Sequence, residues 1–125
     1  MKKIFIAFAI EDKFARDNIK YQSERQINAP FEFVDMSVQE PWSSSWKTNC
    51  RERIKQCDGV VAFLSRNTPN ADGARWEIKC ALEERIPLRA FWVHADDKCC
   101  RPTELQNASV YEWTWDNVRN FINAL

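Results

Sequence analysis

Glycine is scarce in this chain, and that scarcity excludes several common uses of nucleotide-binding folds. The 125 residues include only two glycines, Gly59 and Gly73. Phosphate-binding loops need glycines so that backbone N–H groups can approach the anion, and no G-x-G-x-x-G or G-K-S/T motif is present. The segment Ala9-Ile10-Glu11-Asp12 also differs from the Ser/Thr/Gly loop that would favour flavin. The sequence therefore excludes nucleotide hydrolysis of the phosphate-loop type.

An excess of charge of either sign is also missing, as is any long hydrophobic run. The 18 basic and 18 acidic residues balance, so there is no net field to attract nucleic acid or an anionic membrane. Zero net charge favours self-association or a protein partner instead. No run approaches the ~20 apolar residues of a membrane span. The apolar start, residues 4–10, ends at Glu11-Asp12 without a cleavage site, which favours a buried strand over a signal peptide. We expect a cytoplasmic protein.

Histidine is nearly absent, and the cysteines are spaced poorly for either metal or disulfides. His94 is the single histidine, and the five cysteines include an adjacent pair, Cys99-Cys100. Zinc sites need about four well-spaced ligands, so we predict no metal and reduced thiols. A G-x-S-x-G nucleophile elbow is missing, and Phe63-Leu64-Ser65 stands where a phospho-receiver domain has its aspartate. The remaining candidates for chemistry are carboxylates.

Hydrophobic patterning predicts a single domain, residues 1–125, in which strands alternate with helices. We expect strands at residues 4–8, 31–36, 60–64, 88–93 and 110–111. We expect helices at residues 11–21, 46–57 (capped by Ser44 or Ser45 and closed by Gly59), 73–84 (with Leu82 inward) and 115–125 (capped by Thr114). This order predicts a three-layer, flavodoxin-like α/β fold: a five-stranded, mostly parallel sheet with helices on both faces.

Glu77 is the carboxylate that this arrangement singles out. Ligands bind at the carboxyl ends of the strands in such sheets. Glu77 lies early in the third helix, at the edge of the inward stripe formed by Ala74, Ile78 and Ala81, where we expect it to be half withdrawn from water. An acid in this position either complements the helix dipole or acts on a ligand at the sheet rim.

Several segments, in this order and at this spacing, resemble one family along almost the whole chain. They are Phe5-Ile6-Ala7-Phe8, Pro41-Trp42, Trp46-Lys47, Val60-Val61-Ala62-Phe63-Leu64-Ser65-Arg66-Asn67-Thr68, Ala74-Arg75-Trp76-Glu77-Ile78-Lys79-Cys80-Ala81 and Trp113-Thr114-Trp115-Asp116-Asn117. Together they resemble the TIR-like domains of the bacterial and archaeal Thoeris (ThsB-like) anti-phage proteins. Many TIR domains carry a tryptophan four residues before the catalytic glutamate; here that position is Gly73, and Trp76 precedes Glu77 directly.

The resemblance implies a TIR fold that cleaves NAD⁺ as a substrate, with no separate cofactor. Members of this family make cyclic or conjugated ADP-ribose signals that activate a product-sensing effector protein during phage infection, so a phage-derived trigger is implied as well. Glu77 matches the family's catalytic glutamate. Because the nicotinamide of NAD⁺ is already cationic, one carboxylate that stabilises an oxocarbenium-like centre suffices for the chemistry.

Further residues at the predicted rim are candidate substrate contacts. They are Phe8, Ala9, Asp35, Trp46, Lys47, Asn67 and Trp76. Trp46 and Trp76 either cover the nicotinamide or adenine ring or pack in the core. Lys47 either meets the pyrophosphate or is a plain surface lysine. Asp35 and Asn67 either hold ribose hydroxyls or cap their loops.

Two other functions stay open at this point. One is a non-catalytic TIR-like module that signals by assembling with itself or a partner. The other is an enzyme similar to nucleoside deoxyribosyltransferases, which also use a glutamate on a related fold and act on nucleosides.

Overall fold

Five parallel strands form the centre of the molecule. The computed structural model describes residues 1–25, 31–34 and 44–125. The strands are β1 (Lys2–Ala7), β2 (Phe31–Val34), β3 (Gly59–Leu64), β4 (Leu88–Trp92) and β5 (Val110–Glu112). Their order in the sheet is β2-β1-β3-β4-β5, and every neighbouring pair is parallel. The flavodoxin-like sheet predicted from the sequence is confirmed.

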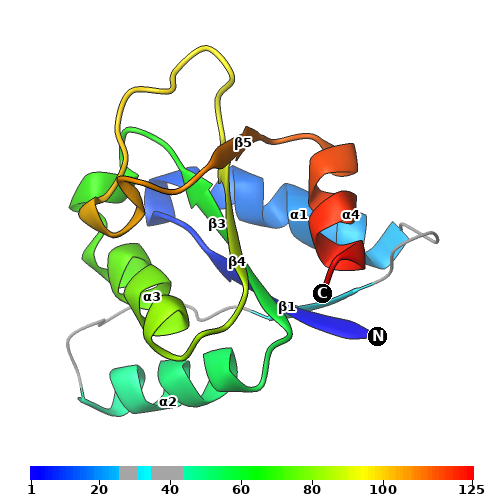
Figure 1. Ribbon diagram of the computed structural model, residues 1–125, viewed down its shortest axis with the longest axis vertical. Helices are drawn as coiled ribbons and strands as arrows, with labels where there is room; N and C mark the ends of the chain where they lie inside the picture. Colours follow the sequence, from blue (N-terminus) through cyan, green and yellow to red (C-terminus); the bar gives the residue numbers. More distant parts are fainter. Residues whose placement is uncertain (26–30, 35–43) are drawn as a thin grey trace.

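Helices cover both faces of the sheet (Figure 1). The helices are α1 (Lys13–Arg25), α2 (Ser44–Lys55), α3 (Asp72–Glu83) and α4 (Trp115–Asn123). Short 3₁₀ turns lie at η1 (Ile10–Asp12), η2 (Thr68–Asn70) and η3 (Thr103–Leu105). In Figure 1, α2 and α3 lie on one side of the strands, and α1 and α4 lie on the other. The result is the predicted three-layer arrangement.

The two helical layers enclose two hydrophobic clusters, one on each face of the sheet. The cluster under α2 and α3 includes Phe5, Trp46, Cys50 and Ile78. The cluster under α1 and α4 includes Ile6, Phe8, Ile19 and Phe121. All six residues of β3 are buried, because a central parallel strand is covered on both faces.

Local packing differs from the sequence prediction at two positions. Gly59 opens β3 instead of closing the helix before it, and a Cβ built there would lie 2.8 Å from Cδ1 of Leu125. Its missing side chain therefore makes room for the C-terminal residue. Leu82 is 45% exposed, so the predicted inward stripe of α3 is wrong at this position. Cys80 is buried in that helix instead.

The last helix begins as predicted. Thr114 caps α4, and its hydroxyl oxygen accepts a hydrogen bond of 3.1 Å from the backbone N–H of Asn117.

Within the ranges described above, none of the helices has the length and apolar character needed to cross a bilayer.

Candidate active site

The strand order reverses between β1 and β3, and polar groups gather near the carboxyl ends of these two strands. Such a reversal is where ligands bind in open parallel sheets. Of the residues that the structure describes, two acidic side chains are buried, and each is 2% exposed. Asp12 follows β1 in the turn η1, and Glu77 lies in the first half of α3. Buried carboxylates are rare, so both are candidates for a special role.

Glu77 is more deeply buried than the sequence predicts. Instead of standing half withdrawn at the rim, its carboxylate lies in the contact between α2 and α3. The Cys50 thiol donates to Glu77 Oε2 over a distance of 3.8 Å. The reason for the deeper burial is that α2 packs directly on α3 and places its own buried residues, Cys50 among them, over this helix.

The thiol beside Glu77 stays protonated at neutral pH. Burial raises the pKa of Cys50 far above its ordinary value, and the nearby charge of Glu77 raises this pKa further. A protonated thiol is a weak hydrogen-bond donor, which is the role that a neighbouring carboxylate requires. Burial likewise raises the pKa of Cys57 and of Cys80, each to about 11. None of these three thiols is therefore an activated nucleophile.

Two tryptophans meet in the same layer as Glu77. The rings of Trp46 and Trp76 lie edge to face, with their centres 5.4 Å apart and an interplanar angle of 62°. Trp46 is buried, whereas Trp76 is half-buried and has the Arg51 guanidinium 5.4 Å from its ring centre. The geometry favours core packing for Trp46. It leaves part of Trp76, the residue before Glu77 in α3, accessible.

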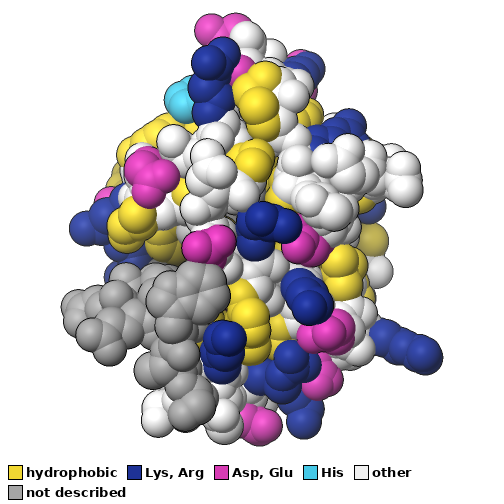
Figure 2. Space-filling view, turned by 90° about the vertical axis from the view of Figure 1, so that its left-hand side faces the viewer, with side chains coloured by type: hydrophobic (Ala, Val, Ile, Leu, Met, Phe, Trp, Pro, Cys, Tyr) yellow, Lys and Arg dark blue, Asp and Glu magenta, His cyan; other side chains and the backbone are white. Residues whose placement is uncertain are grey.

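The outer surface of α2 and α3 carries paired charges. Arg51 bridges to Glu83 at 3.1 Å and to Glu84 at 3.3 Å. Arg75 bridges to Glu104 at 3.1 Å. Figure 2 shows basic and acidic side chains interspersed over this face, without a large patch of one sign. Burial opposes ionisation of Glu104, but the hydrogen bond from Arg75, a backbone hydrogen bond and the nearby positive charges together outweigh it and lower the pKa of that carboxyl.

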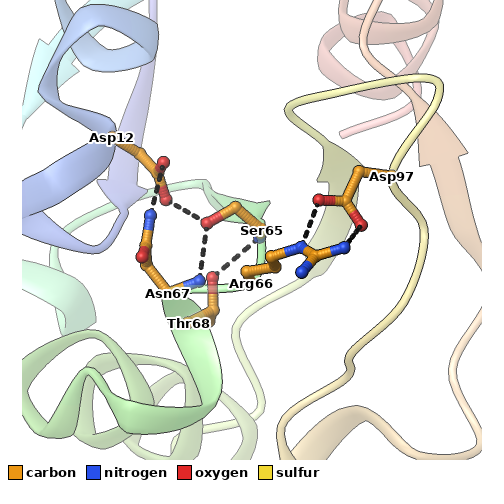
Figure 3. Close-up of polar contacts among 6 residues, drawn as sticks. All are labelled: Asp12, Ser65, Arg66, Asn67, Thr68 and Asp97. Carbon is orange, nitrogen blue, oxygen red and sulfur yellow. Dashed lines mark hydrogen bonds and ion pairs between the residues drawn. The ribbon is translucent and has the colours of Figure 1, made fainter.

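Asp12 is the centre of a separate hydrogen-bonded cluster, drawn in Figure 3. The Ser65 hydroxyl donates to Asp12 Oδ2, and Asn67 Nδ2 donates to Asp12 Oδ1 at 3.3 Å. The backbone N–H of Asn67 in turn donates to Ser65 Oγ at 3.0 Å. Thr68 Oγ1 accepts from the backbone N–H of Ser65 at 3.0 Å. This cluster joins the loop after β1 to the loop after β3.

Sequence reasoning missed Asp12, although a signal for it exists. Asp12 lies in the turn that follows β1, five residues after its end, and the polar segment Ser65 to Thr68 directly follows β3. Because β1 and β3 are adjacent and parallel, their carboxyl ends bring these two segments together. In the sheet, β1 lies beside β3 although β2 comes between them in the sequence. The sequence prediction did not use this neighbour relation for Asp12.

The predicted substrate contacts do not all gather around Glu77. Trp46 and Trp76 pack on each other across α2 and α3, the two helices between which Glu77 is buried, and Lys47 is half-buried next to Trp46 on α2. Asn67 belongs to the Asp12 cluster, where its side-chain amide donates to Asp12 and so connects the loop after β3 to the turn after β1. Asp35 lies outside the described residues, as does the Pro41-Trp42 pair.

The two predicted contacts from the end of β1 are buried. Phe8 is 9% exposed and belongs to the cluster under α1 and α4, on the opposite face of the sheet from Glu77. The Arg16 guanidinium lies 5.5 Å from the centre of the Phe8 ring. Ala9 is 1% exposed. Nothing here brings the Phe8 ring toward the Glu77 carboxylate, so these roles stay predictions.

Solved structures with the same architecture define the class of this domain. The TIR domain of the Toll-related receptor TRR-2 from Hydra magnipapillata superposes with a TM-score of 0.68, at 15% identity, over 99% of this chain and 94% of that one. A prokaryotic SEFIR domain gives a TM-score of 0.62 at 9% identity, over 99% and 95%. A 2-deoxyribosyltransferase from Bacillus psychrosaccharolyticus gives 0.65 at 19% identity, over 94% and 90%. The chain therefore has a TIR-like α/β fold.

The sequence places the chain more narrowly within this class. The profile of the family described as "Thoeris protein ThsB, TIR-like domain" matches residues 5–98. The chain belongs to this family, and the resemblance seen in its motifs is confirmed. Comparison with curated proteins gives no significant match.

Proposed function

We propose that this Thoeris TIR-like domain cleaves NAD⁺ between nicotinamide and ribose, with Glu77 as the catalytic carboxylate. The observation that carries the proposal is a glutamate that is 2% exposed and in contact with the Cys50 thiol, between the two helices on which Trp46 and Trp76 pack edge to face. Burying a carboxylate costs free energy, and groups held in this way concentrate at functional sites. The position of Glu77 in the third helix matches the family resemblance.

The chemistry needs one carboxylate and no metal. The N-glycosidic bond breaks, its electron pair returns to the pyridine nitrogen, and neutral nicotinamide leaves. The Glu77 carboxylate stabilises the positive charge that develops at the ribose carbon. Water that attacks this carbon gives ADP-ribose, whereas a nitrogen or hydroxyl of the same molecule gives a cyclic product.

Burial of Glu77 has two consequences for this reaction. Exclusion of water favours attack by a group of the substrate itself, and thus a cyclic signal over ADP-ribose. The contact between Cys50 and Glu77 must also open before a ribose can reach the carboxylate. A domain that needs such an opening suits activation by a phage-derived trigger or by self-association, followed by action of the product on an effector protein.

Nicotinamide release is the direct test. Purified protein and its Glu77→Gln variant are incubated with NAD⁺, with and without lysate from infected cells, and nicotinamide and ADP-ribose species are separated by chromatography. We expect release by the wild type and at least a hundredfold loss in Glu77→Gln, the scale set by removing one stabilising group from an active site. Glu83→Gln is the matched control, because Glu83 is an exposed glutamate of the same helix.

Two results would redirect the assignment. Equal release by wild type and Glu77→Gln would remove Glu77 from the mechanism. Absence of release in every condition would favour the non-catalytic assembly module. A parallel assay with a 2′-deoxynucleoside and a free base tests the deoxyribosyltransferase alternative, which predicts Glu77-dependent base exchange and no release from NAD⁺.

A further inference from the structure

Helix α2 packs on α3 at the level of Glu77, and Figure 1 shows both helices on the same side of the strands. Trp46 and Cys50 are four residues apart, so they lie on the same face of α2. Trp46 packs on Trp76, and the Cys50 thiol donates to Glu77. Because the Glu77 carboxylate is buried in this contact, a substrate can reach it only after α2 and α3 separate.

Arg51 joins the outer side of α2 to the end of α3. Its guanidinium lies 3.1 Å from Glu83 Oε1 and 3.3 Å from Glu84 Oε1, and 5.4 Å from the centre of the Trp76 ring. The three charged side chains are partly exposed, so salt in the solvent screens their attraction. The contact between α2 and α3 therefore has a buried inner part at Glu77 and a salt-sensitive outer part at Arg51.

The C-terminal end of α2 is fixed to the sheet. The helix ends at Lys55, and Asp58 bonds to β1 in both directions. The backbone N–H of Asp58 donates to the Lys3 carbonyl at 2.8 Å, and the backbone N–H of Lys3 donates to Asp58 Oδ2 at 2.8 Å. Cys57, between them, is buried, and its thiol donates to the Arg53 carbonyl at 3.2 Å. This end stays in place when the preceding turns of α2 move.

We propose that α2 is a hinged cover of Glu77, which pivots at its fixed C-terminal end and is kept closed by the ion pairs of Arg51. The domain then inhibits itself, because the open state in which a ribose can reach Glu77 is a minor population. A trigger that binds the surface exposed by opening increases that population. The effect on NAD⁺ cleavage rests on the proposed function, whereas the movement of α2 does not depend on it.

Chemical labelling of Cys50 measures the opening without NAD⁺. The full chain is treated with iodoacetamide under native conditions, and the labelling of each cysteine is followed by mass spectrometry. Because Cys50 is buried in the closed state, its labelling rate is proportional to the open fraction. We expect labelling of Cys50 in Arg51→Gln to be about five- to fiftyfold faster than in the wild type, the factor for losing two partly exposed ion pairs and a cation–π contact. Labelling of Cys57, at the fixed end, should not change.

Two further variants and a salt series sharpen this test. Lys55→Gln removes a charge from the same helix, but its partner Glu52 is also on α2, so Cys50 should be labelled as in the wild type. Glu83→Gln removes one of the two ion pairs, so its rate should lie between those of the wild type and Arg51→Gln, without loss of nicotinamide release. Sodium chloride should accelerate labelling in the wild type, since the Debye length falls from about 30 Å at 0.01 M to about 3 Å at 1 M, and should have much less effect on Arg51→Gln.

The outcomes separate this inference from the proposed function. Unchanged labelling of Cys50 in Arg51→Gln would overturn the cover, as would equal acceleration at Cys50 and Cys57, which would mean that the whole domain loosens. If NAD⁺ is cleaved, Arg51→Gln should release nicotinamide faster than the wild type without infected-cell lysate, and unchanged or slower release would overturn the self-inhibition. Faster labelling of Cys50 with no nicotinamide release in any condition would support the movement of α2 and contradict NAD⁺ cleavage instead.

Discussion

The two carboxylates that are buried within the described part of the chain have different surroundings. Asp12 and Glu77 are each 2% exposed. Asp12 accepts from the Ser65 hydroxyl and the Asn67 amide, in a network that links two loops. Glu77 accepts from the Cys50 thiol, within a layer of buried apolar and aromatic side chains that includes Trp46 and Ile78. Equal burial therefore does not mean an equal role.

This difference shows how a structural acid is distinguished from a candidate catalytic one. The hydrogen bonds that Asp12 accepts hold the loop after β1 to the loop after β3. Glu77 lies beside Cys50 in a layer of apolar and aromatic side chains, and it is in such water-poor sites that charge stabilises a reacting centre most strongly. We expect changes at Asp12 to alter stability and changes at Glu77 to alter activity.

The largest expected effect is the loss of activity in Glu77→Gln without loss of fold. Glutamine has nearly the volume of glutamate and costs less to bury, and its oxygen can still accept from Cys50. We expect the free energy of unfolding, measured by urea denaturation, to change by less than about 1 kcal/mol. A much larger loss of stability in Glu77→Gln would make Glu77 a structural acid like Asp12.

Asp12→Ala should have the opposite profile. It removes the acceptor of two hydrogen bonds and leaves the buried Ser65 hydroxyl without its partner. Hydrogen bonds to charged groups contribute about 1.5–3 kcal/mol each, so we expect a loss of about 3 kcal/mol in the free energy of unfolding. Glu11→Ala is the matched control, since Glu11 is an exposed acid in the same turn. A loss below about 1 kcal/mol would contradict this account of the Asp12 cluster.

Alkaline pH should weaken the layer around Glu77. Burial raises the pKa of Cys50, Cys57 and Cys80, so the unfolded chain releases these protons first, above its thiol pKa of about 8.5. Stability is then full below about pH 8.5 and falls as pH rises, by about 1.4 kcal/mol per pH unit for each thiol. The fall due to Cys57 and Cys80 ends near pH 11.

The contribution of the thiol beside Glu77 can be isolated. Cys50→Ala should remove one thiol's share of the decline between pH 8.5 and 10, as measured by urea denaturation at each pH. We compare how steeply the free energy of unfolding falls with pH, because the loss of stability caused by the smaller side chain is the same at every pH. Identical slopes for the wild type and Cys50→Ala would show that this thiol does not titrate differently in the folded state.

The smallest expected effect is that of Asn67→Ala. The side-chain amide of Asn67 donates to Asp12 over 3.3 Å, so its loss should cost about 1.5 kcal/mol of stability, the lower end of the range for hydrogen bonds to charged groups. If NAD⁺ is cleaved, KM should stay within about twofold, because the amide is occupied by the loop contact. A large rise in KM at unchanged stability would restore the predicted contact between Asn67 and a ribose hydroxyl.

The order of elements was predictable because it depends on local pattern. A short, continuous apolar run such as Val60 to Leu64 indicates a buried strand, and Thr114 caps its helix through a contact three residues away. The predictions for Gly59 and Leu82 were wrong because they were made from local pattern alone. Their environments depend on Leu125 and on the orientation of α3, which local spacing does not report.

The sequence by itself determined the alternation of strands and helices, the family, and the choice of Glu77 as the acid to examine, since each follows from residue types at short spacing. Tertiary structure decided how deeply Glu77 is buried, that Cys50 faces it, and that Phe8 lies on the other side of the sheet. It alone brought Asp12 to Ser65 and Asn67, and Arg51 to Glu83 and Glu84. The physical reason is that these contacts join residues far apart in the chain, and the sheet order and helix packing set their distances.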